Sequence, residues 1–289
     1  WDGPWEDYRL KKISAATVGH DNGISAPAPD DAAPVWQPPK PIHSFPWLEV
    51  VLISLGILGL IGLIIFFLSP VASGVMAFVK TTLLALIPLS IVVGFLFLIE
   101  PWKTKLALFV WGAGVATLSS GILNTALGTN LAYNLGDLDT ASALSATFVA
   151  PLVEETLKGI GVVIVVIVRR TNINSVLDGV VYAGFSAAGF MFTEDILYFL
   201  REEATGTTSL LFVVAIRGLM SPFVHAMATS MTGIGLALAV LRFKRSWPKA
   251  GIVLLFWFFA MLIHFAWNGS SSLGPARFLM LYLVIQVPG

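Results

Sequence analysis

"PLVEETLKG", residues 151–159, places two adjacent carboxylates and an ammonium inside a hydrophobic run that extends from Ala141 to Val168. Moving a charged side chain to the centre of a bilayer costs roughly 3 kcal/mol on insertion scales, so charges in membrane helices are rare and face the protein interior. A run of this length that keeps three charges predicts a membrane helix whose polar residues form one wall of a buried site.

The composition of the whole chain points the same way. Its 289 residues are 56% hydrophobic and 12% charged, with a mean hydropathy of +0.84, whereas soluble domains carry about 25% charged residues. We therefore expect an all-α, multi-pass protein of the cell membrane, with the lipid bilayer as its solvent. The net charge is zero, which gives no reason to expect nucleic acid as a partner. Cysteine is absent, so any metal must use nitrogen and oxygen ligands.

Two regions differ in composition. Residues 1–46 are rich in Pro, Ala, Asp and Gly and cannot bury enough apolar surface to form a core, so we predict a flexible tail. Residues 47–289 form the predicted membrane domain. The chain starts with Trp1 and stops within an apolar segment at Gly289, and we expect it to be a piece of a longer protein.

Apolar stretches of the length that a bilayer demands repeat along the second region. We predict about eight membrane helices, at 48–68, 75–99, 105–128, 142–168, 178–200, 209–241, 250–270 and 274–288. The sixth stretch is too long for one crossing and contains Pro222, which predicts a short helix at 209–219 and a main helix from the proline onward.

The cations between these stretches predict the orientation of the chain. Three clusters fall on one side of the membrane if the eight helices are right, and they are Lys103 with Lys105, Arg169 with Arg170, and the group from Arg242 to Lys249. Because Lys and Arg collect on the cytoplasmic side, this side and the N-terminal tail are predicted to be cytoplasmic.

Ionisable residues in four predicted helices lie at one depth. Glu154 is 15 residues before Arg169, Glu194 is 16 after Asp178, His225 is 17 before Arg242, and His264 is 15 after Lys249. At a rise of about 1.5 Å per residue, all four lie roughly 22–26 Å from the inner face of a core about 30 Å thick. A single such residue is often a structural hydrogen-bonding group, but four at one level favour a shared site near the outer face.

Spacing within the helices adds detail. Lys158 follows Glu154 by four residues and Glu155 by three, so it can reach back to pair with a carboxylate. His264 and Asn268 share a helical face. Small residues at 182–190 and 232–239 predict close approach of two helices. Asp195 points about 100° away from Glu194 around the helix and is interpreted as contacting a neighbour or the head-group boundary. Asp178 and Arg217 are interpreted as topological or pairing residues, not as catalysts.

These residues lie in recognisable motifs. They are "EETLK" (154–158), "DGVVYAGFSAAGFMFTEDILY" (178–198), "RGLMSPFVHAMATSMTG" (217–233) and "HFAWN" (264–268). Their order and spacing over residues 145–270 resemble the PrsW family of intramembrane proteases, which is distantly similar to the CAAX protease and ABI superfamily. The resemblance implies regulated proteolysis of a single-span membrane protein, such as an anti-sigma factor, cut on its extracytoplasmic side.

Hydrolysis of a peptide bond needs an activated water, a base and stabilisation of the oxyanion. We predict Glu154 as the principal base and Asn268 as the oxyanion donor, with Lys158 tuning a carboxylate. Glu194, His225 and His264 form a set of one carboxylate and two imidazoles that suits a catalytic Zn²⁺. Glu155 either completes the metal shell or orients a histidine.

Alternatives stay open at this point. In a metal-free scheme, Glu154 and Glu194 activate water while His264 and Asn268 bind the oxyanion. A proton- or ion-coupled transporter also places ionisable residues at one depth, although it predicts internal repeats and a site at the midplane. A non-catalytic scaffold that binds a membrane helix is a third possibility. The sequence does not predict an oligomeric state.

Overall fold

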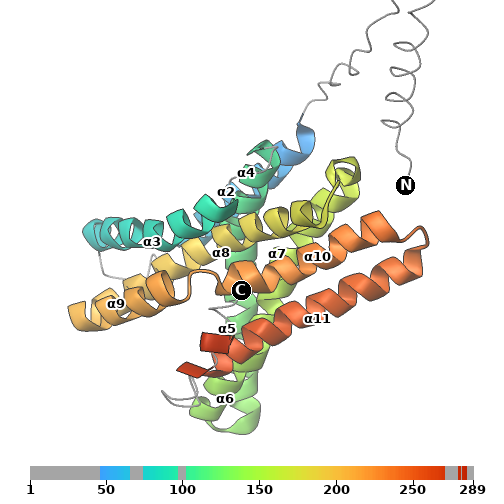
Figure 1. The fold of residues 1–289 in the computed structure, drawn as a ribbon. Helices are drawn as coiled ribbons and strands as arrows, with labels where there is room; N and C mark the ends of the chain where they lie inside the picture. The colour runs from blue at the N-terminus through green and yellow to red at the C-terminus, as the bar shows by residue number, and fades with distance from the viewer. Residues whose placement is uncertain (1–45, 66–73, 97–101, 271–278, 281, 285–289) are drawn as a thin grey trace, which may run out of the picture. The chain divides into compact units, whose positions relative to one another are not determined.

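A computed structural model describes residues 46–65, 74–96, 102–270, 279–280 and 282–284 (Figure 1). Every regular element bounded within these ranges is helical, in agreement with the predicted all-α class. In chain order they are α2 (Trp47–Leu63), α3 (Gly74–Leu96), α4 (Trp102–Val110), η4 (Trp111–Ala116), α5 (Thr117–Leu135), α6 (Leu138–Leu144), η5 (Ser145–Val149), α7 (Ala150–Val168), η6 (Arg170–Asn172), α8 (Val176–Thr205), α9 (Thr207–Val213), η7 (Val214–Met220), α10 (Val224–Arg242) and α11 (Ser246–Ser270).

The described residues contain five helical segments long and apolar enough to cross a membrane, fewer than the eight predicted. They are Gly74–Gly94, Trp102–Leu135, Val176–Thr205, Thr207–Arg242 and Ser246–Ser270. The predicted first helix corresponds to α2, which is apolar but only 17 residues long. The fourth corresponds to α7, which is apolar but carries three charged residues, Glu154, Glu155 and Lys158. Most of the eighth, 274–288, lies outside the described residues.

The predicted break in the sixth stretch is confirmed. α9 and η7 form a short helical arm, a turn follows at Ser221, and α10 begins at Val224, two residues after Pro222 instead of at it. The backbone N–H and the hydroxyl of Ser221 both donate to the carbonyl of Ile216, at 2.9 and 2.7 Å. These two bonds satisfy a carbonyl at the end of the arm and fix where the chain turns.

Four helices build the environment of the predicted site. α10 lies between α8 and α11 and packs against both (Figure 1). α7 contacts all three, and in the view of Figure 1 it crosses them at a steep angle. Side chains that point inward from these four helices can therefore meet.

Glycines allow α8 and α10 to touch backbone to backbone. A Cβ atom at Gly179 would lie 2.2 Å from the carbonyl oxygen of Gly233, and one at Gly233 would lie 2.1 Å from the oxygen of Gly179. Since real Cβ contacts are longer, only glycine fits at both positions. The predicted close approach of small-residue stretches is confirmed for this helix pair.

Buried apolar residues and two hydrogen bonds hold α7 in place. Val162 and Val165 of α7 pack in the main hydrophobic cluster, and both are fully buried. The indole N–H of Trp111 donates to the carbonyl of Leu157 at 3.0 Å, and the hydroxyl of Ser186 donates to the carbonyl of Lys158 at 3.0 Å. Both acceptors lie within the charged stretch, so neighbouring elements anchor α7 where its polar residues are.

Wide helical turns occur beside the site. η4, η5 and η7 are π-helical, a geometry that is rare and often found at functional sites. η5 leads directly into α7, where Pro151 lies in the first turn and its missing N–H removes little hydrogen bonding. The preceding helix starts at Asp137, which accepts from the backbone of Asp139 and Thr140. A hydrogen bond from the Thr140 hydroxyl lowers the pKa of Asp137.

The predicted tail, residues 1–46, falls almost wholly outside the described residues. The division at 46/47 and the cytoplasmic orientation of the N-terminus stay predictions.

Candidate active site

The ionisable residues predicted to share one depth meet in the structure. α7 supplies Glu154, Glu155 and Lys158, α8 supplies Glu194, α10 supplies His225, and α11 supplies His264. His225 Nε2 lies 3.0 Å from Glu194 Oε2, and His264 Nε2 lies 3.8 Å from Glu154 Oε2. The two imidazole rings are edge to face, with centroids 5.0 Å apart. The predicted convergence of four helices is confirmed.

Glu155 forms the closed centre of this cluster. Its Oε1 lies 2.5 Å from Lys158 Nζ and 2.9 Å from His264 Nδ1, while the hydroxyl of Thr229 donates to Oε2 at 2.8 Å. The side chains of Glu155 and Lys158 have no exposed area. Lys158 thus reaches back to a carboxylate as the spacing predicts, and both oxygens of Glu155 are engaged.

Glu154, in contrast, has a free oxygen. The amide of Asn124 donates to Oε1 at 3.3 Å, but Oε2 is buried and has no hydrogen-bond partner in the described part of the chain. Lys158 Nζ and His264 Nε2 lie at 4.0 and 3.8 Å from this oxygen, beyond hydrogen-bonding distance. A buried carboxylate oxygen without a partner is costly, so this atom points to a missing ligand.

His225 joins two charged groups through its two nitrogens. Nδ1 lies 3.2 Å from Lys158 Nζ, and Nε2 lies 3.0 Å from Glu194 Oε2. The ring of Phe190 lies beside the imidazole and beneath the lysine, with Lys158 Nζ 4.4 Å from the centre of that ring. The histidine is therefore held on one face by an aromatic ring and at both nitrogens by polar groups.

Glu194 also contacts a cation that the sequence analysis set aside as a pairing residue. Arg217 Nη2 donates to Glu194 Oε2, and Arg217 Nε donates to Asp195 Oδ1 at 2.6 Å. The guanidinium lies over the ring of Tyr198, 4.2 Å from its centre. Asp195 thus contacts a neighbour and Arg217 is a pairing residue, as the sequence predicts, although the sequence did not predict that they pair with each other. The ion pair borders the site.

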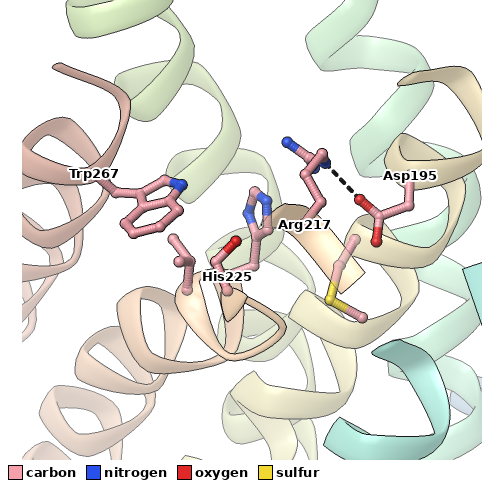
Figure 2. A pocket seen from close by; sticks show the side chains of 7 residues that line it. Asp195, Arg217, His225 and Trp267 are labelled. Carbon is pink, nitrogen blue, oxygen red and sulfur yellow. Dashed lines mark hydrogen bonds and ion pairs between the residues drawn. The ribbon is translucent and has the colours of Figure 1, made fainter. Parts of the chain in front are cut away.

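A small pocket opens beside this group (Figure 2). In Figure 2 the ring of His225 lies between Trp267 on one side and Arg217 on the other, with Arg217 bonded to Asp195. The cavity is about 10 Å³, room for a single water molecule. The pocket is therefore large enough for one water molecule beside His225 and Arg217.

Three residues offer donor atoms for a metal ion. Glu154, His225 and His264 each offer one ligand atom, and these three atoms lie within 4.8 Å of one another. All three residues are buried. One carboxylate and two imidazoles suit Zn²⁺ with an open position. The unpartnered Oε2 of Glu154 fits this interpretation, because a cation would complete its coordination. The sequence-predicted ligand set had Glu194 where this geometry has Glu154.

Asn268, the predicted oxyanion donor, donates its side-chain amide to the carbonyl of Ala146 in η5, at 2.9 Å. This bond ties the end of α11 to the turn that precedes α7. The catalytic and metal-binding roles assigned to individual residues from sequence stay predictions.

Sequence reasoning missed two direct partners of the acidic pair. Asn124 in α5 donates to Glu154, and Thr229 in α10 donates to Glu155. Thr229 lies four residues after His225, on the same helical face, and this spacing was a usable signal. Asn124 is one of several polar residues of α5, among them Ser120, Thr125 and Asn130, and nothing in its spacing connects it to α7.

Comparisons with known proteins agree with this geometry. Residues 100–289 match the model of the PrsW-protease family, described as PrsW family intramembrane metalloprotease. No curated protein matches the chain, and no solved structure matches it. The match covers well over half of the sequence and includes every residue of the cluster, so the chain belongs to the PrsW family of intramembrane metalloproteases.

Proposed function

We propose that the protein is a zinc-dependent endopeptidase that cleaves a single-span membrane protein within the bilayer, near its extracytoplasmic side. One observation carries the proposal. Donor atoms of Glu154, His225 and His264 converge within 4.8 Å among buried helices, and one of the Glu154 oxygens lacks a partner. Family membership favours proteolysis over transport as the use of this polar cluster.

In this proposal Glu154, His225 and His264 hold the metal. Bound there, a divalent cation supplies Lewis-acid chemistry, because it polarises the scissile carbonyl and stabilises charge on its oxygen. Glu155 orients His264 through Nδ1, which leaves the lone pair of Nε2 for the metal. The ammonium of Lys158 keeps Glu155 ionised, so this orienting contact is maintained.

Glu194 is the carboxylate best able to move a proton. Both of its contacts, with Arg217 and with His225, use Oε2, and its side chain is 16% exposed. The other oxygen can therefore accept a proton from an attacking water and return it to the leaving amine. Glu155 is less suited to this role, because both its oxygens are engaged and it is fully buried.

The substrate class follows from where the cluster lies. Glu194, His225 and His264 lie in helical segments of membrane-spanning length, and α7 packs against all three of those helices, so a peptide that reaches the cluster must lie within the bilayer. The depth count places the cleaved bond toward the outer face. A single-span protein such as an anti-sigma factor, implied by the family resemblance, fits this class.

Comparison of membrane proteomes tests the proposal. Cells that express the wild-type chain should contain a shortened single-span protein that is absent when Glu154→Gln replaces it. Arg169→Gln is a suitable control, because Arg169 pairs with Glu49 away from the cluster, and cleavage should persist in it. An unchanged set of membrane-protein termini with Glu154→Gln would overturn the protease assignment.

Purified protein then tests the metal. The identified substrate, reconstituted in vesicles, should be cleaved by the wild-type protein, protected after chelation, and cleaved again when Zn²⁺ is restored. Cleavage that persists through chelation would instead support the metal-free scheme, in which Glu154 and Glu194 activate the water.

A further inference from the structure

We propose that Arg217 is a positioning residue for the metal site. It holds Glu194 against His225 and so determines which nitrogen of that histidine keeps the lone pair for the metal. This inference rests on the proposed metal site of Glu154, His225 and His264, and it adds a residue from the arm formed by α9 and η7.

The first step is that the Arg217 side chain is held through two of its N–H donors and through one face of its guanidinium group. Nη2 bonds Glu194, Nε bonds Asp195 at 2.6 Å, and the guanidinium plane lies over Tyr198. Two adjacent carboxylates on α8 and a ring one turn further on therefore hold a single side chain from η7. A planar guanidinium with several donors can make these contacts together, whereas an ammonium has no such fork.

The second step is that Glu194 determines the tautomer of His225. The oxygen that Arg217 bonds, Oε2, is the one that lies 3.0 Å from His225 Nε2. An ionised carboxylate only accepts hydrogen bonds, so Nε2 of a neutral imidazole carries the proton. Nδ1 then keeps its lone pair, which here accepts from Lys158 Nζ at 3.2 Å. A metal would take the place of this contact at Nδ1 and leave the ammonium to Glu155, 2.5 Å away.

The third step is the parallel with the other histidine. Glu155 contacts His264 Nδ1 at 2.9 Å, and Lys158 lies 2.5 Å from the same carboxylate oxygen. Each histidine therefore has one carboxylate on one nitrogen, and each carboxylate has one cation. Partners of this kind orient metal-binding histidines, and their loss typically lowers metal affinity by about 10–100-fold.

The arm that carries Arg217 is well placed for this role. η7 ends at the Ser221 turn, where two hydrogen bonds to Ile216 fix its last residues. The Arg217 side chain is 21% exposed and borders the pocket shown in Figure 2. A change at Arg217 thus alters the water-accessible side of the cluster without opening the closed centre at Glu155.

Titration of the purified protein with Zn²⁺ tests the inference. Arg217→Gln should bind Zn²⁺ about 10–100-fold more weakly than the wild type, and Arg217→Lys should recover part of that loss. Glu194→Gln should weaken binding to a similar degree. The Zn²⁺ affinity of the double variant should be no lower than that of the single variant that binds Zn²⁺ more weakly, because both changes remove one shared contact.

Arg169→Gln provides a matched control. Arg169 also forms a carboxylate ion pair, with Glu49 at 2.9 Å, and its side chain has the same 21% exposure. The Arg169→Gln variant should melt at a temperature similar to that of Arg217→Gln, while the Zn²⁺ affinity of Arg169→Gln stays at the wild-type value. A merely structural role for Arg217 predicts that the two variants behave alike in both measurements.

Three results would overturn the inference, and the third has a different meaning from the first two. Wild-type Zn²⁺ affinity in Arg217→Gln, or losses that add fully in the double variant, would remove Arg217 from the metal site and leave the proposed function intact. A wild-type protein that binds no Zn²⁺ in the same titration would overturn the metal site itself, and the role of Arg217 with it.

Discussion

The two carboxylate–histidine pairs of the site have the same parts but different exposure. The Glu155 pair is Glu155 with His264, and its cation is Lys158; the carboxylate and the ammonium have no exposed side-chain area. The Glu194 pair is Glu194 with His225, and its cation is Arg217; the side chain of Glu194 is 16% exposed and that of Arg217 is 21% exposed. One pair is closed within α7, α10 and α11, and the other borders a water-sized pocket.

This difference separates two kinds of work. Charges that are fully removed from water need their partners, since the loss of one leaves the other buried and uncompensated. Charges that keep access to water can exchange protons with it. We therefore assign the Glu155 pair to holding the site together and the Glu194 pair to proton transfer, and the variants below test this division.

The largest expected effect is on catalysis and comes from the Glu194 pair, the more exposed of the two. Glu194→Gln should lower the rate of substrate cleavage by about 10²–10⁴-fold, because an amide cannot accept the proton of the attacking water. Its Zn²⁺ affinity should fall much less, by about 10–100-fold, because Glu194 orients a ligand without being one. Cleavage assays and metal titration on one preparation provide both numbers. Complete loss of metal binding would instead make Glu194 a ligand, as the sequence first indicated.

The closed pair should show its effect in stability. Lys158→Met should destabilise the protein by about 3–5 kcal/mol, because Glu155 would stay buried without its cation. The double variant Lys158→Met with Glu155→Leu should recover much of that loss, since no buried charge is left unpaired. Arg217→Met should cost less than Lys158→Met, because Glu194 is 16% exposed whereas Glu155 is fully buried. Unfolding in detergent measures all three, and equal losses at Lys158 and Arg217 would contradict the comparison.

The closed pair was the more predictable of the two from sequence. Glu155 and Lys158 are three residues apart on one helix, and helical geometry alone brings them together. The shared depth of Glu154, Glu194, His225 and His264 also needed only the helix rise and the positions of the charged residues at the helix ends. Local spacing therefore predicted that these residues meet.

What spacing did not predict is which atoms face one another. The donor atoms of Glu154, and not those of Glu194, lie within 4.8 Å of His225 and His264 as a group that could hold a metal, and this depends on how α7 and α8 are rotated. Contacts such as that of Ser186 with the Lys158 carbonyl join these two helices. The count of eight membrane helices is not confirmed. Of the helices predicted from sequence, α2 has only 17 residues and α7 carries three charges, so neither is among the five described segments that are long and apolar enough to cross a membrane. The charges that build the site thus make α7 atypical of a membrane helix.

The smallest expected effects compare one supporting residue from each pair. Thr229→Val removes the hydroxyl that donates to the buried Glu155 at 2.8 Å and should cost about 1.5–3 kcal/mol, as for other hydrogen bonds to charged groups. Tyr198→Leu removes the ring beneath the partly exposed Arg217 and should cost about 0.5–1 kcal/mol. Melting in detergent ranks the two. A larger loss of stability in Tyr198→Leu than in Thr229→Val would mean that the arm carrying Arg217 stabilises the fold more than the buried centre does. Exposure would then not be a sufficient reason for assigning proton transfer to the Glu194 pair.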